Sequence, residues 1–211
     1  MTESQTNPRP SLRARQAAAT RRLIVQAAAG AFEEKGYAGA RIEDIAAAAG
    51  VAYPTVYKTF ATKRDLLAAA VQSAMTGGPE DSVDRQRWFI EQLEEPDPRR
   101  QLQLVARNAR RLNERAGRLL EVVRAAGRAD PQIAALWQAI NHERLARSRT
   151  TASALTRKAA IRGTVAHTAG TLWTLTLPEL YVAQVDGAGI TPATYQRWLG
   201  EVLINALLPD E

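Results

Sequence analysis

Two short helical patterns that meet at a glycine, between residues 42 and 60, limit what this chain can fold into more than any other feature. The first pattern has its apolar residues at helical spacing and runs into Gly50, where the second begins at once. The second pattern carries Val56 and Phe60 on one face, so we expect that face to pack against the helices before it. A short helix, a glycine turn and a second helix form the arrangement that places the second helix in the major groove of DNA. The segment therefore predicts a helix-turn-helix unit.

The second helix of this unit is expected to begin near residue 52 or 53 and to present a polar outer surface. A proline in the first turn of a helix has no intrahelical N–H bond to lose, so Pro54 is compatible with this start. The positions expected on or near the outer surface are Tyr53, Pro54, Thr55, Tyr57, Lys58 and Thr59. Hydroxyl groups, aromatic rings and a lysine suit contacts with phosphates and base edges. The alternative is that Tyr57 and Phe60 are core aromatics and Lys58 is a solvated charge.

One further helix is expected on each side of this unit. Residues 11 to 35 are rich in alanine with apolar positions at helical spacing, and Gly36 is expected to end this first helix. Thr62 and Asp65 form a pair typical of a capping box, which predicts a fourth helix. The sequence Gly-Gly-Pro at 77–79 is expected to end that helix.

At these positions the chain resembles the tetracycline-repressor (TetR) family of transcriptional regulators. The residues that carry the resemblance are Phe32, Gly36, Tyr37, Asp44, Ile45, Ala46, Ala49, Gly50, Val51, Thr55, Tyr57, Phe60, Lys63 and Leu66. The match covers residues 20 to 67. A second set looks like one large subgroup of regulators, and it consists of Trp173, Pro178, Tyr181, Tyr195, Trp198 and the terminal leucines.

The resemblance implies an all-α protein with an N-terminal helix-turn-helix DNA-binding domain and a larger helical domain for ligand binding and dimerisation. We expect a flexible basic arm over residues 1–15, the DNA-binding domain over residues 16–75 and the ligand-binding and dimerisation domain over residues 76–211. The function implied is that of a ligand-responsive regulator, a repressor, that binds a palindromic operator as a homodimer. A small hydrophobic molecule is expected to release the operator.

The resemblance also implies which side chains contact DNA. Tyr57 would give its hydroxyl to a phosphate, and Lys63 would meet another phosphate through its backbone N–H or its side chain at a helix N-terminus. Tyr53, Thr55 and Lys58 are the candidates for base edges, where lysine favours guanine acceptors and threonine can touch a thymine methyl.

Two positions depart from the family's pattern, because family members usually have Ser or Thr as caps of the second and third helices. Here Ala40-Arg41 and Ala52 stand at these positions. Each lost cap is expected to cost about 1 kcal/mol of helix stability. Arg41 is expected to replace one of the lost phosphate contacts by its charge.

The basic excess of the chain lies near its N-terminus, in agreement with an acidic partner. The net charge is +6 and the pI is about 10.0, and the residues up to Leu67 include ten Lys or Arg against six Asp or Glu. Arg9, Arg13 and Arg15 of the arm are predicted to lie along the minor groove or the backbone of DNA. The alternative is a solvated tail.

The sequence predicts that the C-terminal region is helical. At three positions a capping side chain precedes a proline, which is typical of a helix start: Asp97-Pro98, Asp130-Pro131 and Thr191-Pro192.

Pockets between helices are mostly apolar with a few polar anchors. The candidates for a ligand cavity are Trp88, Phe89, Trp137, His142, Trp173 and Tyr181. As a group they favour a hydrophobic or aromatic ligand, although each alone would also fit an ordinary core.

The last predicted helix, residues 192 to 208, has an apolar surface wider than one stripe, which favours a subunit interface. The interface candidates are Tyr195, Trp198, Val202, Ile204 and Leu208. The alternative is a helix buried within the monomer.

Neither an enzyme nor a metal or cofactor site is expected. His142-Glu143 begins like a zinc-protease motif, but Ala146 stands where its second histidine belongs. With two histidines, no cysteine, no phosphate-binding glycine loop and no Gly-x-Ser-x-Gly elbow, no catalytic constellation emerges. The lack of cysteine and of a long apolar run predicts a cytoplasmic protein without a membrane partner. A purely architectural DNA-binding protein is the competing hypothesis.

Overall fold

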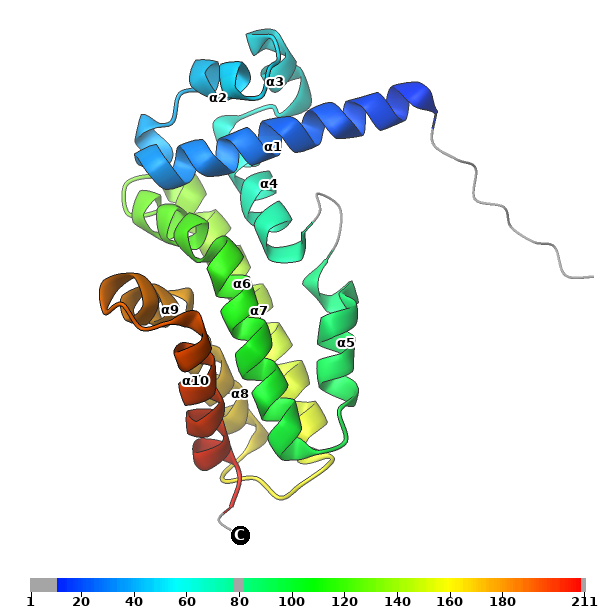
Figure 1. Cartoon of the computed structure of the whole chain (residues 1–211), viewed down its shortest axis with the longest axis vertical. Helices are drawn as coiled ribbons and strands as arrows, with labels where there is room; N and C mark the ends of the chain where they lie inside the picture. Colours follow the sequence, from blue (N-terminus) through cyan, green and yellow to red (C-terminus); the bar gives the residue numbers. More distant parts are fainter. Residues whose placement is uncertain (1–10, 78–81, 210–211) are drawn as a thin grey trace, which may run out of the picture.

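The computed structural model describes residues 11–77 and 82–209, and these parts of the chain are almost entirely helical (Figure 1). The helices are α1 (Leu12–Gly39), α2 (Ile42–Ala48), α3 (Tyr53–Thr59), α4 (Lys63–Thr76), α5 (Arg87–Glu94), α6 (Pro98–Ala126), α7 (Pro131–Thr156), α8 (Val165–Leu175), α9 (Pro178–Val182) and α10 (Pro192–Leu207). Two short turns complete the set, a 3-10 turn η1 (Val83–Arg85) and a π-helical turn η2 (Ala183–Gly187). No strand occurs in the described ranges, so the all-α prediction is confirmed.

The ends of the N-terminal helices follow the local signals of the sequence. Gly36 has φ 69° and ψ 176°, which breaks the helical geometry of α1 where its end was predicted. Gly77 ends α4 with φ 81°, whereas Gly78 and Pro79 lie outside the described residues. At the start of α4 the Thr62 hydroxyl accepts a hydrogen bond from the Asp65 N–H at 3.1 Å, which confirms the predicted cap.

The three predicted helix starts of the C-terminal region are also confirmed. Asp97, Asp130 and Thr191 are the N-caps of α6, α7 and α10, and each is followed by a proline in the first turn. Their side chains accept backbone N–H bonds at 2.9, 2.8 and 3.2 Å respectively. These caps satisfy donors that have no partner within the helix.

The helices form two groups along the length of the molecule (Figure 1). Helices α1 to α4 lie at one end, and the long helices α6 and α7 run from there to the other end, with α5 on one side and α8 and α10 on the other. Helix α6 is the centre of this arrangement, because it packs against α1, α4, α5, α7, α9 and α10. The N-terminal helices are therefore supported directly by the larger helical region.

Two hydrophobic cores share α6 between them. The C-terminal half of α6 buries Leu119 and Val123 in a core that also contains the buried side chains of α1 to α4. Its N-terminal half buries Leu102 and Ala106 in a second core with α8, α9 and α10. Because one rigid helix belongs to both cores, a displacement in the larger region can reach the N-terminal helices.

Two of the residues predicted for a subunit interface lie inside the chain's own core. Tyr195 is completely buried, where its ring meets Tyr181 edge to face with centroids 5.1 Å apart, and burial raises the pKa of Tyr195 to about 12. Leu208 is also buried. The prediction that these two side chains face a partner is therefore wrong, because the main apolar stripe of α10 packs on α6 and α8. The other candidates, Trp198, Val202 and Ile204, are only half-buried.

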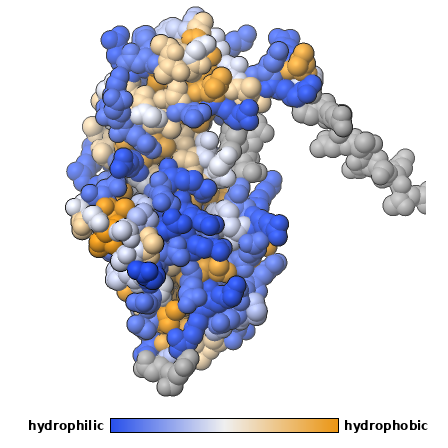
Figure 2. Space-filling model, in the orientation of Figure 1, coloured by the Kyte–Doolittle hydropathy of each residue, from blue (hydrophilic) through white to orange (hydrophobic). Residues whose placement is uncertain are grey.

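The molecular surface is mostly polar and carries a few exposed apolar side chains. Figure 2 shows a largely hydrophilic face over the central helices, with hydrophobic residues in separate patches. Leu12 and Leu23 on α1 are among the exposed large apolar residues. Within the described parts of the chain, no helix is long and apolar enough to cross a membrane.

Candidate nucleic-acid interface and internal cavity

Buried residues of the helix-turn-helix unit hold α3 in a fixed orientation. Ile45 of α2 and Val56 of α3 are buried, and Gly50 makes the turn between the helices with φ 66°. Phe60 follows α3 into the core, and the Arg21 guanidinium lies 4.3 Å from the centre of its ring. This confirms that Val56 and Phe60 form the inner face, which leaves the opposite face of α3 open.

The open face of α3 carries two tyrosines in contact with each other. Tyr53 and Tyr57 are 42% and 45% exposed, and their ring centroids lie 5.2 Å apart in an edge-to-face arrangement. A hydrogen bond with the Tyr57 side chain raises the pKa of Tyr53. The two rings therefore form one exposed aromatic surface at the start and middle of the helix.

The remaining residues of this face differ in whether their polar groups already have a hydrogen-bond or ion-pair partner within the protein. Pro54 and Lys58 are exposed, and Lys58 makes no hydrogen bond or ion pair with any part of the chain that the structure describes. Thr55 and Thr59 are half-buried, and the Thr59 hydroxyl donates to the Thr55 carbonyl at 2.7 Å. Lys58 is therefore the free cation of this surface among the described residues, whereas the hydroxyl of Thr59 is already used within the helix.

The side chain of Lys63 points away from this surface. Its ammonium group donates to the carbonyl of Ala38 at 3.3 Å and lies 4.9 Å from the centre of the Tyr37 ring, and burial lowers its pKa. The backbone N–H of Lys63 nevertheless lies in the first turn of α4. Of the two predicted routes to a phosphate, the geometry favours the backbone N–H.

Helices α2 and α3 lack side-chain caps, as their sequences predict. The N-cap positions are Arg41 and Ala52, and neither side chain makes a capping hydrogen bond. The Arg41 guanidinium instead lies 3.7 Å from the carboxylate of Glu43, and both side chains are largely exposed. Arg41 therefore lies at the surface beside the helix-turn-helix unit with a weak ion pair.

The basic N-terminal segment is more helical than predicted. Helix α1 begins at Leu12 and is capped by the Ser11 hydroxyl, which accepts from the Ala14 N–H at 3.2 Å. Arg13 and Arg15 are therefore exposed on the first turns of a helix that extends beyond the rest of the N-terminal group (Figure 1). Arg9 lies outside the described residues.

Comparison with known proteins agrees with this geometry. The model of the bacterial regulatory proteins of the tetR family matches residues 24–70. The helix-turn-helix-type transcriptional regulator YezE of Bacillus subtilis (strain 168) is 38% identical over 55 residues, which cover 26% of this chain and 28% of YezE. The alignment therefore spans less than a third of the length of that curated relative.

Two solved structures show that the likeness extends over the whole fold. A protein described as a TetR-family transcriptional regulator from Mesorhizobium loti MAFF303099 is 26% identical, with a TM-score of 0.70 over 92% of this chain and 99% of that chain. A transcriptional regulator from Saccharomonospora viridis, solved in complex with choline, is 18% identical, with a TM-score of 0.70 over 90% of this chain and 98% of that chain.

The fold and the exposed face of α3 thus define a helix-turn-helix transcriptional regulator with a larger helical domain. Residues 24–70 match the TetR family of bacterial regulatory proteins, and the chain as a whole is similar in fold to a TetR-family transcriptional regulator. This family is a class of regulators rather than of enzymes. In the described residues, no cluster of histidines and carboxylates is arranged to hold a metal ion.

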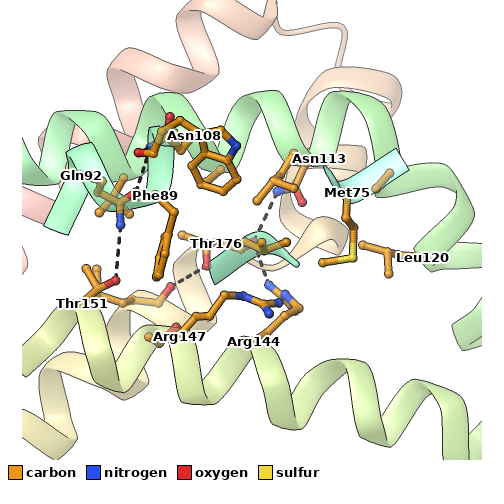
Figure 3. Close-up of a pocket in the computed structure, with 18 residues that line it drawn as sticks. Met75, Phe89, Gln92, Asn108, Asn113, Leu120, Arg144, Arg147, Thr151 and Thr176 are labelled. Atoms are coloured by element: carbon orange, nitrogen blue, oxygen red, sulfur yellow. Dashed lines mark hydrogen bonds between the residues drawn. The ribbon is translucent and has the colours of Figure 1, made fainter. Parts of the chain in front are cut away.

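A cavity of about 100 Å³, partly open to solvent, lies in the larger helical region, between the end of α4 and helices α5, α6, α7 and α8 (Figure 3). Two of the predicted cavity residues, Trp88 and Phe89 of α5, line it. Met75 of α4 also lines it, so the cavity touches the N-terminal group directly. The remaining apolar wall is formed by Val83, Val105, Ala109, Leu112, Ala116, Leu120 and Leu172.

The other four predicted residues do not line this cavity, so their assignment to it is wrong. His142 is exposed on the outer face of α7, and Trp137 packs against the core of the N-terminal helices. Tyr181 belongs to the second core, and Trp173 of α8 lies outside the cavity wall. Aromatic type alone did not indicate the direction of these side chains, which depends on how each helix is rotated in the bundle.

Polar residues of the cavity wall were missed in the sequence. The amides of Gln92 and Asn108 are buried, and Asn108 donates to the Gln92 carbonyl oxygen at 3.0 Å, while Gln92 donates to the Thr151 hydroxyl at 3.3 Å. Arg144 and Arg147 of α7 reach the cavity from the opposite side (Figure 3). These contacts create a polar network inside an otherwise apolar wall.

A periodic signal for these arginines is present in α7. Residues at helical spacing along one face are Ile133, Trp137, Ile140, Arg144, Arg147, Thr151 and Leu155. The two ends of this stripe are apolar, which predicts that the face is buried. Two arginines in its middle therefore indicate buried charge. This interruption of the apolar stripe could have identified Arg144 and Arg147 as cavity residues, which a search for aromatic side chains did not find.

Proposed function

We propose that this chain is a ligand-responsive repressor that binds a palindromic operator as a homodimer and is released by a small molecule. The observation that carries the DNA-binding part is the exposed face of α3, where two tyrosines and an unpaired lysine stand on a helix fixed by Val56 and Phe60. A rigid helix with a free polar face is what insertion into a major groove requires. A bacterial regulator that binds DNA would act in the cytoplasm, which is the proposed location of this chain.

Each residue of this face has a proposed role. Tyr57 and the backbone N–H of Lys63 contact phosphates, and they position α3 on the duplex. Tyr53, Thr55 and Lys58 contact base edges, with Pro54 packing at the start of the helix against the groove wall.

Charges on either side of α3 extend the proposed interface. Arg41 lies beside the start of α2, and Arg13 and Arg15 lie on the projecting turns of α1. Their positive charge would follow the neighbouring phosphates, which adds affinity and salt dependence without sequence preference. Residues 16–75 are thus proposed to form the DNA-binding domain, and residues 76–211 the ligand-binding and dimerisation domain.

The proposed dimer interface uses the parts of α10 that the monomer leaves uncovered. Trp198, Val202 and Ile204 flank the buried stripe of this helix and keep part of their surface exposed. A two-fold interface of this kind would place the two α3 helices about 34 Å apart, one turn of B-DNA, or a multiple of this distance.

The internal cavity is proposed to hold the effector. The choline complex of the Saccharomonospora viridis regulator supports this proposal, since that protein shares the fold of this chain. Met75 lines the cavity at the end of α4, and Arg115 of α6 donates to the Met75 carbonyl at 3.1 Å. A ligand that displaces Met75 would move α4 and hence the helix-turn-helix unit, so two conformations would differ in their affinity for the operator.

The test is selection of bound sequences from a random duplex pool with the full chain, followed by a mass measurement of the complex. The expected result is an inverted repeat bound by two copies of the chain. Binding to all duplexes with equal affinity would contradict the proposal and favour an architectural DNA-binding protein. The variant Val202→Glu should reduce the mass of the free protein to that of a monomer, whereas Gln138→Glu on the exposed side of α7 should not.

A further inference from the structure

The cavity contains two arginines that have no carboxylate partner inside it. Arg144 donates to the Thr176 carbonyl at 2.9 Å and to the Asn141 side-chain oxygen at 3.3 Å, which are neutral acceptors. Arg147 is only 13% exposed, and in the described parts of the chain the one carboxylate within 4 Å of it belongs to Glu143, at 3.6 Å. The Glu143 side chain is 67% exposed on the same helix, so it lies toward solvent rather than in the cavity.

More distant carboxylates compensate this pair only in part. Glu179 raises the pKa of Arg144 but forms no ion pair with it within 4 Å, and it pairs instead with Arg124 at 3.8 Å. Asp84 acts on Arg147 from an exposed position. Burial, which is the largest influence, lowers the pKa of Arg144 to about 10. Both guanidinium groups remain charged at neutral pH in a site that compensates them poorly.

The wall opposite the arginines is polar and uncharged. Asn108 and Asn113 project from α6 and face the side chains of α7 across the cavity (Figure 3). The Asn108 amide nitrogen is used by Gln92, but its side-chain oxygen is buried without a hydrogen-bond partner among the described residues. The cavity is therefore positive on its α7 side and carries an acceptor oxygen on its α6 side, and the rings of Trp88 and Phe89 also line it.

From this arrangement we propose that the effector is a small organic acid whose carboxylate binds Arg144 and Arg147 and whose apolar body lies against Trp88 and Phe89. The proposal rests on the function proposed above and names the chemical class of its ligand. Guanidinium groups bind carboxylates through short, charge-assisted hydrogen bonds, which are strong where water is excluded. A cation would meet two poorly compensated positive charges, and a neutral ligand would leave them as they are.

The volume of the cavity limits the size of this acid. A single water molecule needs at least about 10–15 Å³, so a cavity of about 100 Å³ has room for a small organic molecule. Benzoate, phenylacetate and 3-phenylpropionate match this size, and the rings would contact Trp88 and Phe89.

The experiment compares these three acids with benzamide, phenylacetamide and 3-phenylpropionamide, which have the same shape without the charge. Binding to the full chain without DNA is measured by calorimetry and by the rise in melting temperature. At least one acid is expected to bind about tenfold or more tightly than its amide, because hydrogen bonds to a charged group are stronger. Equal affinities for acids and amides, or no acid that binds better than its amide, would overturn the proposal.

Two variants test whether the preference for acids depends on an arginine of the cavity. Arg147→Gln should reduce the preference for the acid over its amide several-fold, because one of the two guanidinium groups is lost while Arg144 remains. Arg149→Gln, which removes the same charge from an exposed position of the same helix, should leave the preference unchanged. A preference that Arg147→Gln leaves undiminished, or that Arg149→Gln reduces equally, contradicts the proposed site.

The melting temperature without ligand gives a second, independent readout. A buried charge that is poorly compensated costs stability, so Arg147→Gln should melt at the same temperature as the natural chain or higher. A large decrease would show instead that Arg147 supports the fold. Because none of these measurements uses DNA, acids that bind in a chain without operator preference would refute the proposed function and leave the ligand class intact.

Discussion

Tyr57 and Tyr53 lie one helical turn apart on α3 and meet edge to face, with ring centroids 5.2 Å apart. An edge-to-face contact is a favourable geometry for two aromatic rings, and it favours one orientation of each side chain. The two residues are spaced i, i+4, where side chains on a helix surface are neighbours. The aromatic pair thus holds the Tyr57 hydroxyl at the outer surface of α3 before DNA binds.

The first prediction concerns that hydroxyl. Tyr57→Phe keeps the ring and its edge-to-face contact with Tyr53. It removes the hydroxyl, and with it both the hydrogen bond to Tyr53 and the proposed hydrogen bond to a phosphate. Binding to every duplex should weaken by about tenfold or more, since a hydrogen bond to a charged group contributes roughly 1.5–3 kcal/mol. Fluorescence anisotropy with the selected operator and with an unrelated duplex measures this loss. Tyr181→Phe, which changes a buried tyrosine of the other domain, is the control, and an unchanged Tyr57→Phe affinity would remove Tyr57 from the interface.

The second prediction separates sequence recognition from general attraction. Lys58→Ala should reduce the discrimination between the operator and single-base variants by about 1–3 kcal/mol at one position, because a lysine to guanine contact is lost. Lys35→Ala removes the same charge from the same domain, but Lys35 is paired with Asp44 at 3.2 Å. Repeating the duplex selection with both variants should show a relaxed position only for Lys58→Ala. A consensus that is identical for both variants would argue against base contact by Lys58.

The third prediction uses the position of Lys63 at the start of α4. Lys63→Ala retains the backbone N–H and should change DNA affinity by less than about threefold, with a loss of about 0.5–1 kcal/mol in stability from the contact with Tyr37. Lys63→Pro also removes the N–H, and proline is tolerated at the first helical position when the preceding residue is extended, as Thr62 is with φ −137° and ψ 161°. Lys63→Pro should therefore weaken binding to all duplexes by about tenfold beyond Lys63→Ala.

Gel-shift titrations of both Lys63 variants against two unrelated duplexes measure this difference. Circular dichroism checks that α4 is retained in Lys63→Pro. Equal affinities of the two variants would mean that the N–H does not meet a phosphate.

The fourth prediction concerns stability at low pH. The hydrogen bond with the Thr62 hydroxyl, together with smaller influences of Arg64, holds the pKa of Asp65 below its usual value of 3.8. A carboxyl group with a lowered pKa stabilises the folded state fully above its unfolded pKa, and this contribution is lost as the pH falls through the folded pKa. The natural chain should therefore melt higher than Asp65→Asn at pH 6, with a difference that shrinks below about pH 4.

Thermal melts from pH 6 to pH 2 provide the measurement. In a Thr62→Val background the effect of Asp65→Asn should be smaller, since the largest cause of the lowered pKa is gone. A difference between the natural chain and the Asp65→Asn variant that stays constant over the whole pH range would contradict the assigned hydrogen bond.

The helix-turn-helix unit could be predicted from the sequence because its determinants are local. Gly36 and Gly50 adopt positive φ, Thr62 caps α4, and Val56 and Phe60 share one face of a short helix. Each of these features depends on neighbours within a few residues, so backbone preferences and helical spacing suffice to specify them. For the same reason, the three pairs of a capping residue and a proline in the C-terminal region predicted the starts of α6, α7 and α10 correctly.

Only the tertiary structure decided which side chains of the larger region lie inside it. Trp88 and Phe89 line the cavity while His142 is exposed, and Tyr195 is buried against Tyr181 although its helix looked like an interface. Sequence alone determined where most helices begin and end, because that information is carried by adjacent residues. The rotation of each helix about its axis depends on packing between segments far apart in the chain, such as α5 against α7 or α6 against α10. That packing placed two arginines in an apolar wall and so decided the chemistry of the cavity.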